Sequence, residues 1–357
     1  MLLHLKLIKI GHCLKPKMIY KKKLLTISIV TPTWNSNIKL FERVLKELKR
    51  QIYPRELIEH IVFDAGSTNG TAELAKKYGC KVTIRADLKV QEQVRQSLAI
   101  KKARGDLVLI LQSDNIPTSK NWLKEMVQPF IDNKKVFCTF SAYNDYEKNM
   151  SATTRYGAFF GAGDPTLYYL GKADKIPLLQ KKWNKGKIID ETRRYWIVEF
   201  NKDNLPTLGD NGHMFRRSAM NRVNKDPKRY VHLDMYIDML GLGYNTCGVV
   251  KNSVIHVITP SIFTYAKRRM QVKETFYDRR RGKRKYLVFS WKSHKDQLNL
   301  IKFAFFSLTF IFPLYESIRG YIRIRDKAWF LHPLLSFIMF LAYGFSELRW
   351  FASRFKK

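Results

Sequence analysis

The stretch Gly105–Pro117, GDLVLILQSDNIP, constrains the fold more than any other part of this chain. Leu107–Leu111 is an unbroken apolar run, typical of a strand buried on both faces of a parallel sheet. Polar residues follow at once, and Pro117 prevents a simple continuation of the strand. Ligands of open α/β sheets bind at the carboxyl ends of strands, so we expect Asp114 at a metal or phosphate site. For this peptide alone, an Asp/Asn turn that merely ends a strand explains the pattern equally well.

The first third of the chain is predicted to alternate strands with helices. The predicted strands are Leu24–Val30, Leu57–Phe63, Lys81–Ile84 and Leu107–Leu111, and the helices between them are Leu40–Leu48, Thr71–Tyr78 and Val94–Ala103. This order predicts βαβ units and a doubly wound, mostly parallel sheet flanked by helices. Polar segments at Thr31–Asn35 and Asp64–Gly70 follow their strands as Asp114 follows its own, so three loops should share one sheet edge. A P-loop and a dinucleotide fingerprint are absent from the sequence.

Three motifs in this order resemble the nucleotide-sugar-binding half of family 2 glycosyltransferases of the GT-A fold. They are TPTWN at 31–35, FDAGSTNGT at 63–71 and KKARGDLVLILQSDN at 101–115. The sequence departs from the family pattern at three places. Gln112 replaces the first acid of D-x-D, Asn69 replaces the second acid of the second motif, and Gln96-Ser97 replaces an Arg-Asn pair.

Two later stretches extend the resemblance. Gly209–Arg217 is similar to the segment whose backbone lies under the donor sugar, and Tyr230–Met235 resembles the start of the helix that supplies the catalytic base. His232 and Asp234 stand where a paired acid is more usual. A carboxylate at a helix start is also explained by capping alone.

The resemblance implies an inverting transferase that moves a sugar from a nucleotide-diphosphate sugar to a hydroxyl or phosphate acceptor. It assigns Asp234 as the base, with Asp210 and Asp238 as the next candidates. It assigns a divalent metal, Mg²⁺ or Mn²⁺, to Asp114 and to His256, although His256 could equally be an ordinary core or surface histidine. The residues it assigns to the donor are Thr31, Pro32, Asn35, Asp64, Ser67, Arg95, Asp114, Gly212, Arg268 and Arg269.

The charge of the chain indicates a polyanionic partner. Lys and Arg total 65 against 30 Asp and Glu, a net charge of +35. Nucleic acid, anionic lipid or a phosphorylated substrate would fit this excess, although a lysine-rich composition alone also explains it. Because no nucleic-acid-binding signature is present, nucleic acid is the least favoured partner. The four scattered cysteines indicate a reducing compartment without structural zinc.

The C-terminal part is apolar and basic in turn. Phe303–Leu314 and Ala328–Phe345 are apolar runs separated by the basic stretch Arg319–Lys327. The second run is near the ~18 residues that a spanning helix needs. We favour a helical hairpin or interfacial pair in the cytoplasmic leaflet, with Trp329, Tyr343 and Trp350 as interface anchors. This favours an anionic membrane surface and a lipid-linked or glycan acceptor as partners. Helices packed over the catalytic domain are the alternative.

These patterns divide the chain into four parts: a basic segment 1–23, a nucleotide-sugar-binding half 24–135, an acceptor-side half 136–290 and a membrane-associated helical region 291–357. The N-terminal segment is interrupted by Lys6 and Lys9, which argues against a secretory signal peptide. Within the acceptor half, Val136–Phe140 is predicted as an edge strand and 145–204 as irregular. Gln112 leaves open a family member that binds sugar without catalysing transfer, and a basic nucleic-acid-binding protein is the more distant alternative.

Overall fold

The computed structural model describes residues 24–209, 211–259, 261–275 and 281–354. The predicted N-terminal segment 1–23 and the candidate base Asp210 therefore lie outside the described residues.

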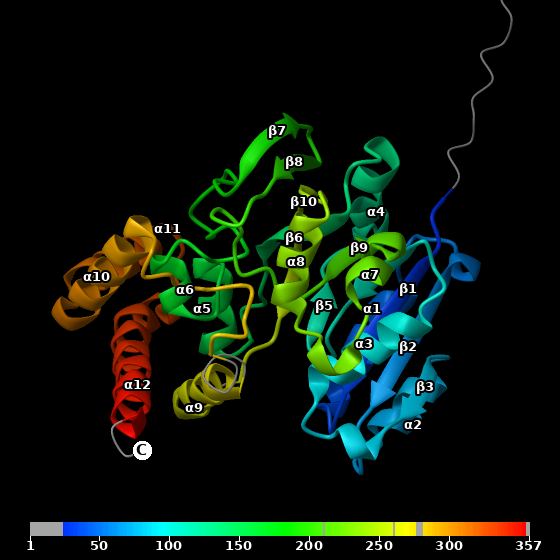
Figure 1. Cartoon of the computed structure of the whole chain (residues 1–357), viewed down its shortest axis with the longest axis horizontal. Helices are drawn as coiled ribbons and strands as arrows, with labels where there is room; N and C mark the ends of the chain where they lie inside the picture. The colour runs from blue at the N-terminus through cyan, green and yellow to red at the C-terminus, as the bar shows by residue number, and fades with distance from the viewer. Residues whose placement is uncertain (1–23, 210, 260, 276–280, 355–357) are drawn as a thin grey trace, which may run out of the picture.

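A mixed ten-stranded sheet forms the centre of the described structure (Figure 1), with the strand order β3-β2-β1-β4-β9-β6-β10-β8-β7 and β5 paired to β10. The strands are β1 (Ile27–Thr33), β2 (Ile58–Asp64), β3 (Lys81–Ile84), β4 (Leu107–Ile110), β5 (Asn115–Pro117), β6 (Cys138–Asn144), β7 (Lys187–Glu191), β8 (Tyr195–Glu199), β9 (His213–Arg216) and β10 (Thr246–His256). Strands β1 to β4 are parallel, β9 runs against its neighbours β4 and β6, and β10 is parallel to β6. The predicted α/β fold is confirmed.

Helices cover both faces of this sheet because its central strands are apolar on both sides. In β1, Ile27 and Ile29 belong to one core cluster and Val30 to the other. The first face carries α1 (Ile38–Lys49), α2 (Thr71–Lys77) and α4 (Trp122–Asp132). The opposite face carries α3 (Glu92–Lys102), α7 (Arg217–Val223) and α8 (His232–Gly241).

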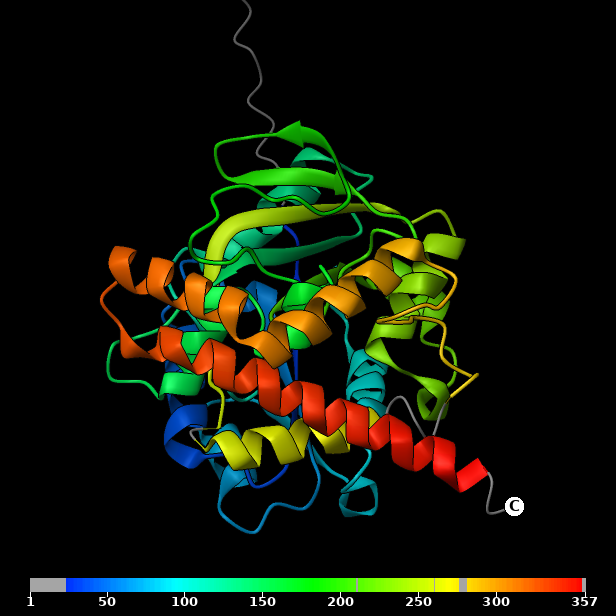
Figure 2. The ribbon, with the colours of Figure 1, turned by 90° about the vertical axis from the view of Figure 1, so that its left-hand side faces the viewer.

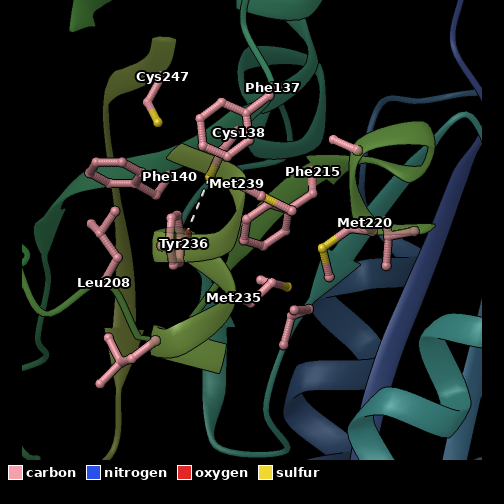
Figure 3. Close-up of a cluster of buried hydrophobic side chains, with 14 of the residues drawn as sticks. Phe137, Cys138, Phe140, Leu208, Phe215, Met220, Met235, Tyr236, Met239 and Cys247 are labelled. Atoms are coloured by element: carbon pink, nitrogen blue, oxygen red, sulfur yellow. Dashed lines mark hydrogen bonds between the residues drawn. The ribbon is translucent and has the colours of Figure 1, made fainter. Parts of the chain in front are cut away.

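The core between α8 and the sheet is rich in aromatic and sulfur-containing side chains (Figure 3). Tyr236 of α8 points between Phe215 of β9 and Cys138 of β6, and its hydroxyl lies 3.4 Å from the Cys138 Sγ. The same hydroxyl is 2.7 Å from Nδ1 of the buried His213. These contacts fix α8 against the strands, and with it the first turn of α8 at the sheet edge.

Two predictions for the acceptor half are wrong. The strand predicted at the sheet edge, Val136–Phe140, is β6, which lies inside the sheet between β9 and β10. It is interior because β9, more than seventy residues later in the chain, inserts beside it, and such pairing leaves no local signal. The segment predicted as irregular contains α5 (Ala152–Phe160), α6 (Pro165–Tyr169), β7 and β8. The division of the chain at residue 135 stays a prediction, since one sheet runs across it.

Three helices and a short 3-10 turn make up the C-terminal region (Figure 2): α10 (His294–Thr309), α11 (Ile311–Arg323), η5 (Lys327–Phe330) and α12 (Leu331–Arg354). They lie beside one another on one side of the molecule, with α9 (Ile262–Lys273) next to α12. Helices α10 and α11 meet at 78°. Among the described residues, Lys327–Ser353 is long and apolar enough to cross a membrane.

This region also packs on the catalytic part through its own aromatic core. Trp329 is 1% exposed and stacks on Phe159 of α5, with ring centroids 4.3 Å apart. Its predicted role as a membrane-interface anchor is therefore wrong, because the indole is needed to fill this core.

Candidate active site

Hydrogen bonds join the three loops at the carboxyl ends of β1, β2 and β4. The Asn35 amide donates to the Ser67 Oγ at 2.7 Å, and the Thr68 amide donates to the Asn35 Oδ1 at 2.9 Å. The Ser36 Oγ donates to the Ser113 Oγ at 2.9 Å, which links the first loop to the loop of Asp114. The structure thus brings together the three polar segments that the strand order places at one edge.

Thr31, which was predicted to bind the sugar donor, is fully buried within this edge. Its hydroxyl donates to the Leu111 carbonyl at 2.8 Å and lies 2.9 Å from Nε2 of His60. Because the single hydroxyl proton is already given to Leu111, the His60 Nε2 must be the donor in the second contact. Burial lowers the pKa of His60 to about 4, so the ring is neutral at pH 7. Thr31 therefore supports the loops from beneath, and Pro32 beside it is also buried.

Asp64 is the anchor of the second loop. It is 0% exposed. One carboxylate oxygen accepts from the Ser67 amide at 2.6 Å, and the other accepts from the hydroxyls of Thr33 and Ser67 at 2.7 and 2.6 Å. These bonds hold the ends of β1 and β2 together. Contact of Asp64 with the nucleoside stays a prediction.

Asp114 and His256, the two predicted metal ligands, are neighbours in space. The Val257 amide donates to the Asp114 carbonyl at 3.1 Å, and β10 pairs His256 with Asn115. The Asn211 Nδ2 lies 3.5 Å from Nδ1 of His256. Within the described residues, no group of three or more His, Cys, Asp or Glu side chains gathers in a way that could hold a metal alone.

This donor set fits a cation that the protein shares with a diphosphate. One carboxylate and one imidazole are too few for a site made of protein alone, whereas Mg²⁺ is commonly held by one or two carboxylates together with substrate phosphates. Mn²⁺ also accepts oxygen and imidazole ligands.

Helix α3 lies between these loops and α8. The Gln112 Nε2 donates to Glu92 at 3.1 Å, and the neighbouring Gln93 accepts two hydrogen bonds from His232 through its Oε1. Both side-chain polar atoms of Gln96 are buried without a hydrogen-bond partner in the described part of the chain. Arg95, which was predicted to bind the sugar donor, is 3% exposed, and its guanidinium donates hydrogen bonds to the carbonyls of Leu88 and Lys89.

The first turn of α8 presents two candidate bases in different settings. Both Asp234 carboxylate oxygens are 3.0 Å from Nε of the buried Arg284, and one also accepts from the Tyr286 amide at 3.0 Å. The His232 amide and Nδ1 each lie 3.0 Å from the Gln93 Oε1. Since an amide oxygen only accepts, Nδ1 must carry a hydrogen, and in the neutral ring Nε2 is then the basic nitrogen.

The remaining predicted residues divide between packing and exposure. Gly212 has φ +74, and an added Cβ would lie 3.2 Å from the Trp122 ring, so its glycine requirement is already explained by packing. On α9, Arg268 is exposed, whereas the Arg269 guanidinium lies 5.3 Å from the Tyr265 ring centroid. The two neighbouring arginines therefore lie in different surroundings. Their contact with the donor stays a prediction.

Two features of the site are not among the residues predicted from the sequence. Trp34 is 44% exposed at the end of β1, and the Lys89 Nζ lies 4.8 Å from its ring centroid. An exposed aromatic ring with a cation beside it is suited to a base and its phosphate. Gln93 is 6% exposed and connects α3 to α8, and it lies just before the helix predicted from the sequence, Val94–Ala103.

The mostly parallel sheet with helices on both faces and the three-loop edge define a fold of the GT-A type. Residues 28–221 match Glycosyl transferase family 2, which is more than half of the chain. The chain therefore belongs to glycosyl transferase family 2.

Known proteins resemble it more distantly. The poly(ribitol-phosphate) beta-N-acetylglucosaminyltransferase TarS of Staphylococcus aureus is 32% identical over 117 residues, which is 30% of this chain and 19% of TarS. The match thus spans about a fifth of that relative's length. The mannosyltransferase PcManGT from Pyrobaculum calidifontis, solved in complex with GDP-Man and Mn²⁺, shares the fold with a TM-score of 0.52 at 13% identity, covering 90% of this chain and 86% of that one.

Proposed function

We propose that this chain is an inverting glycosyltransferase that moves a sugar from a nucleotide-diphosphate sugar to a hydroxyl or phosphate acceptor. The observation that carries the proposal is the joined edge of three loops, where Asp114 lies beside His256. The solved mannosyltransferase of the same fold binds GDP-Man and Mn²⁺, which supports a donor and a divalent ion of these classes.

Asp114 and His256 would hold Mg²⁺ or Mn²⁺ together with the donor diphosphate. When bound, the ion neutralises negative charge on the leaving diphosphate. The chain's own part is to position that diphosphate: the loops are rigid because Asp64, Ser67 and Asn35 bond to one another.

An acceptor hydroxyl needs a general base on the side opposite the leaving group. Asp234 is the base predicted from the resemblance, and it would take the proton on a carboxylate oxygen. Its two carboxylate oxygens already accept hydrogen bonds from the Arg284 Nε, and one also accepts from the Tyr286 amide. His232, whose Nδ1 is turned to Gln93, is therefore the second candidate and would take the proton at Nε2.

We also propose that the acceptor is lipid-linked or a glycan, and that the C-terminal region associates with the cytoplasmic face of a membrane. The apolar helices α10 to α12 and the net charge of +35 support this. A family member that binds sugar without transfer is the second candidate function, favoured by Gln112 and by the small set of metal-binding side chains around Asp114.

The deciding experiment measures thermal stability and hydrolysis with UDP-, GDP- and dTDP-sugars, each with and without Mn²⁺. We expect one nucleotide class to raise Tm by a few degrees at saturating concentration, and only with the ion present. Stabilisation without hydrolysis or transfer to any acceptor would favour the sugar-binding member. No stabilisation by any of the nucleotides would overturn both.

The Asp114→Ala variant tests the metal assignment. We expect the Mn²⁺-dependent part of donor binding to disappear while the variant keeps the parent circular dichroism spectrum, since one side chain supplies most of the protein's negative charge to the ion. Asp203→Ala, in an exposed loop, is the matched control and should bind as the parent does. Equal donor affinity in Asp114→Ala and the parent, with Mn²⁺ present, would remove Asp114 from the site.

A further inference from the structure

The outer side of the C-terminal helices carries a broad exposed apolar surface. More than half of the large apolar side chains that are exposed in the described structure lie between Leu298 and Phe351. Among them, Phe305 of α10 is 58% exposed, Ile311 of α11 is 71% exposed and Phe345 of α12 is 57% exposed. The three helices lie beside one another on one side of the molecule (Figure 2). An apolar surface that extends over all three is larger than scattered apolar residues produce, and it marks an interaction site.

The inner side of α12 is held to the folded domain along its length. His332, near its start, is buried and its Nδ1 lies 3.0 Å from the Tyr156 hydroxyl. The Tyr343 hydroxyl donates to Asp164 at 2.5 Å. Further along, Glu347 pairs with Lys273 at 2.8 Å. Polar partners therefore occur from one end of the apolar stretch to the other.

These contacts decide how α12 can meet a lipid bilayer. A helix that crossed the hydrocarbon would carry Glu347 and its partners toward the membrane interior or lose them, and both are costly. A helix lying parallel to the bilayer keeps every one of these contacts and buries only its outer face. That face carries Leu334, Leu341 and Leu348, which recur at seven-residue spacing.

The acidic and basic side chains of the C-terminal helices differ in their exposure. Of its four acids, Asp296 is buried, and Glu316 and Asp326 are largely covered, each with its side chain 14% exposed. The fourth, Glu347, has its side chain 50% exposed but is paired with Lys273 and Arg281. The basic side chains are exposed around the apolar surface: Lys292, Lys295, Lys302, Arg319, Arg323, Arg325, Lys327 and Arg349. An apolar surface bordered by cations is complementary to anionic lipid headgroups over a hydrocarbon layer.

We propose that the outer face of α10, α11 and α12 docks in the plane of an anionic lipid bilayer, and that α12 does not cross it. The inference rests on the membrane association proposed above and adds its geometry: one leaflet, three helices side by side, and basic residues at the headgroups. The acceptor side of the sheet is thereby brought to the membrane surface as part of one rigid body with these helices.

Vesicle binding tests the surface. The purified full chain is sedimented with vesicles of phosphatidylcholine, with or without phosphatidylglycerol, at low and high salt. We expect strong binding to the anionic vesicles that weakens with salt. Arg319→Glu with Arg323→Glu should lower this affinity about tenfold or more, since each cation near the surface contributes to binding. Phe305→Glu with Phe345→Glu should also reduce it, whereas Ile188→Glu with Ile189→Glu on β7 is the matched apolar control and should not.

Spin labels at two positions of α12 test the orientation. Leu334→Cys and Leu348→Cys are labelled separately in a Cys13→Ser background, because Cys80, Cys138 and Cys247 are buried. In-plane docking predicts equal depth for both labels. A spanning helix predicts depths that differ by about 21 Å, at 1.5 Å per residue.

Unequal depths, absence of vesicle binding, or self-association through this face without lipid would each overturn the proposal. Donor-induced thermal stabilisation is measured on the same samples. If docking fails while donor binding is intact, the transferase proposal stands and the docking proposal fails. If the donor response is lost while docking is normal, the docking proposal stands and the transferase proposal fails. Variants that show the parent thermal response to donor are also shown to be folded.

Discussion

At the scale of single residues, His232 and Asp234 can be separated by substitution. If Asp234 is the base, as the resemblance assigns, we expect Asp234→Asn to lower transfer about 100-fold or more with donor-induced stabilisation unchanged. A base at the His232 Nε2 predicts the same loss in His232→Asn instead. Asp234→Asn removes the charge that faces Arg284, so we expect lower thermal stability. Donor-saturated transfer rates and Tm are the measurements. If Asp234→Asn loses transfer and His232→Asn retains the parent rate, the base is Asp234 as the resemblance predicts.

The residue scale also shows how far sequence reasoning reaches into the site. The three loops were predictable because each follows a continuous apolar run, and strand ends in a parallel sheet share one edge. The contacts inside those loops were not predictable from the sequence. An aspartate after a strand can face a ligand or its own neighbours, and Asp64 accepts hydrogen bonds from Thr33 and Ser67. The link between Gln93 and His232 joins positions 139 residues apart, which a single sequence cannot reveal.

At the scale of elements, two glycines of the C-terminal helices offer a matched test of packing. A Cβ on Gly320 of α11 would lie 2.3 Å from the Trp329 ring, whereas Gly344 of α12 has nothing within 4 Å. We expect Gly320→Ala to destabilise the fold by about 1–3 kcal/mol through overpacking. Gly344→Ala should be neutral or stabilise by up to about 1 kcal/mol, since alanine favours helix. Chemical denaturation measures both. Equal stability of the two variants would contradict the contact of α11 with Trp329.

Elements with strong local patterns agree with prediction to within a few residues. The strand predicted at Lys81–Ile84 has these bounds in β3, and the helix predicted at Thr71–Tyr78 is α2, Thr71–Lys77. The apolar run Phe303–Leu314, by contrast, is divided between α10 and α11 at Phe310, whose φ is +60. Apolar composition predicts helix there but carries no information on where a helix turns by 78°.

At the scale of the whole molecule, the catalytic part and the C-terminal helices share a core. Tyr156 and Phe160 of α5 are buried beside Leu335 and Met339 of α12. An ion pair of 2.8 Å between the Arg155 Nε and Asp326 joins the same parts, with both side chains mostly covered. The sequence suggested either a separable membrane region or helices packed on the domain. The structure shows helices packed on the domain through the inner side of α12, with apolar side chains exposed on its outer side.

This shared core predicts that the full chain unfolds as one cooperative unit. A chain that ends at Leu298 would expose the aromatic face of α5, so we expect a lower Tm and aggregation, although the predicted metal ligands and α8 are all retained. A chain that ends at Trp350 loses only residues that are exposed where described, and it should melt as the full chain does. Calorimetry with and without the sugar donor measures the Tm of the full chain and of the two shortened chains. If the chain ending at Leu298 stays soluble, keeps the parent Tm and still binds donor, the C-terminal helices are a separable module, and the aromatic core of α5 and α12 contributes little to the fold.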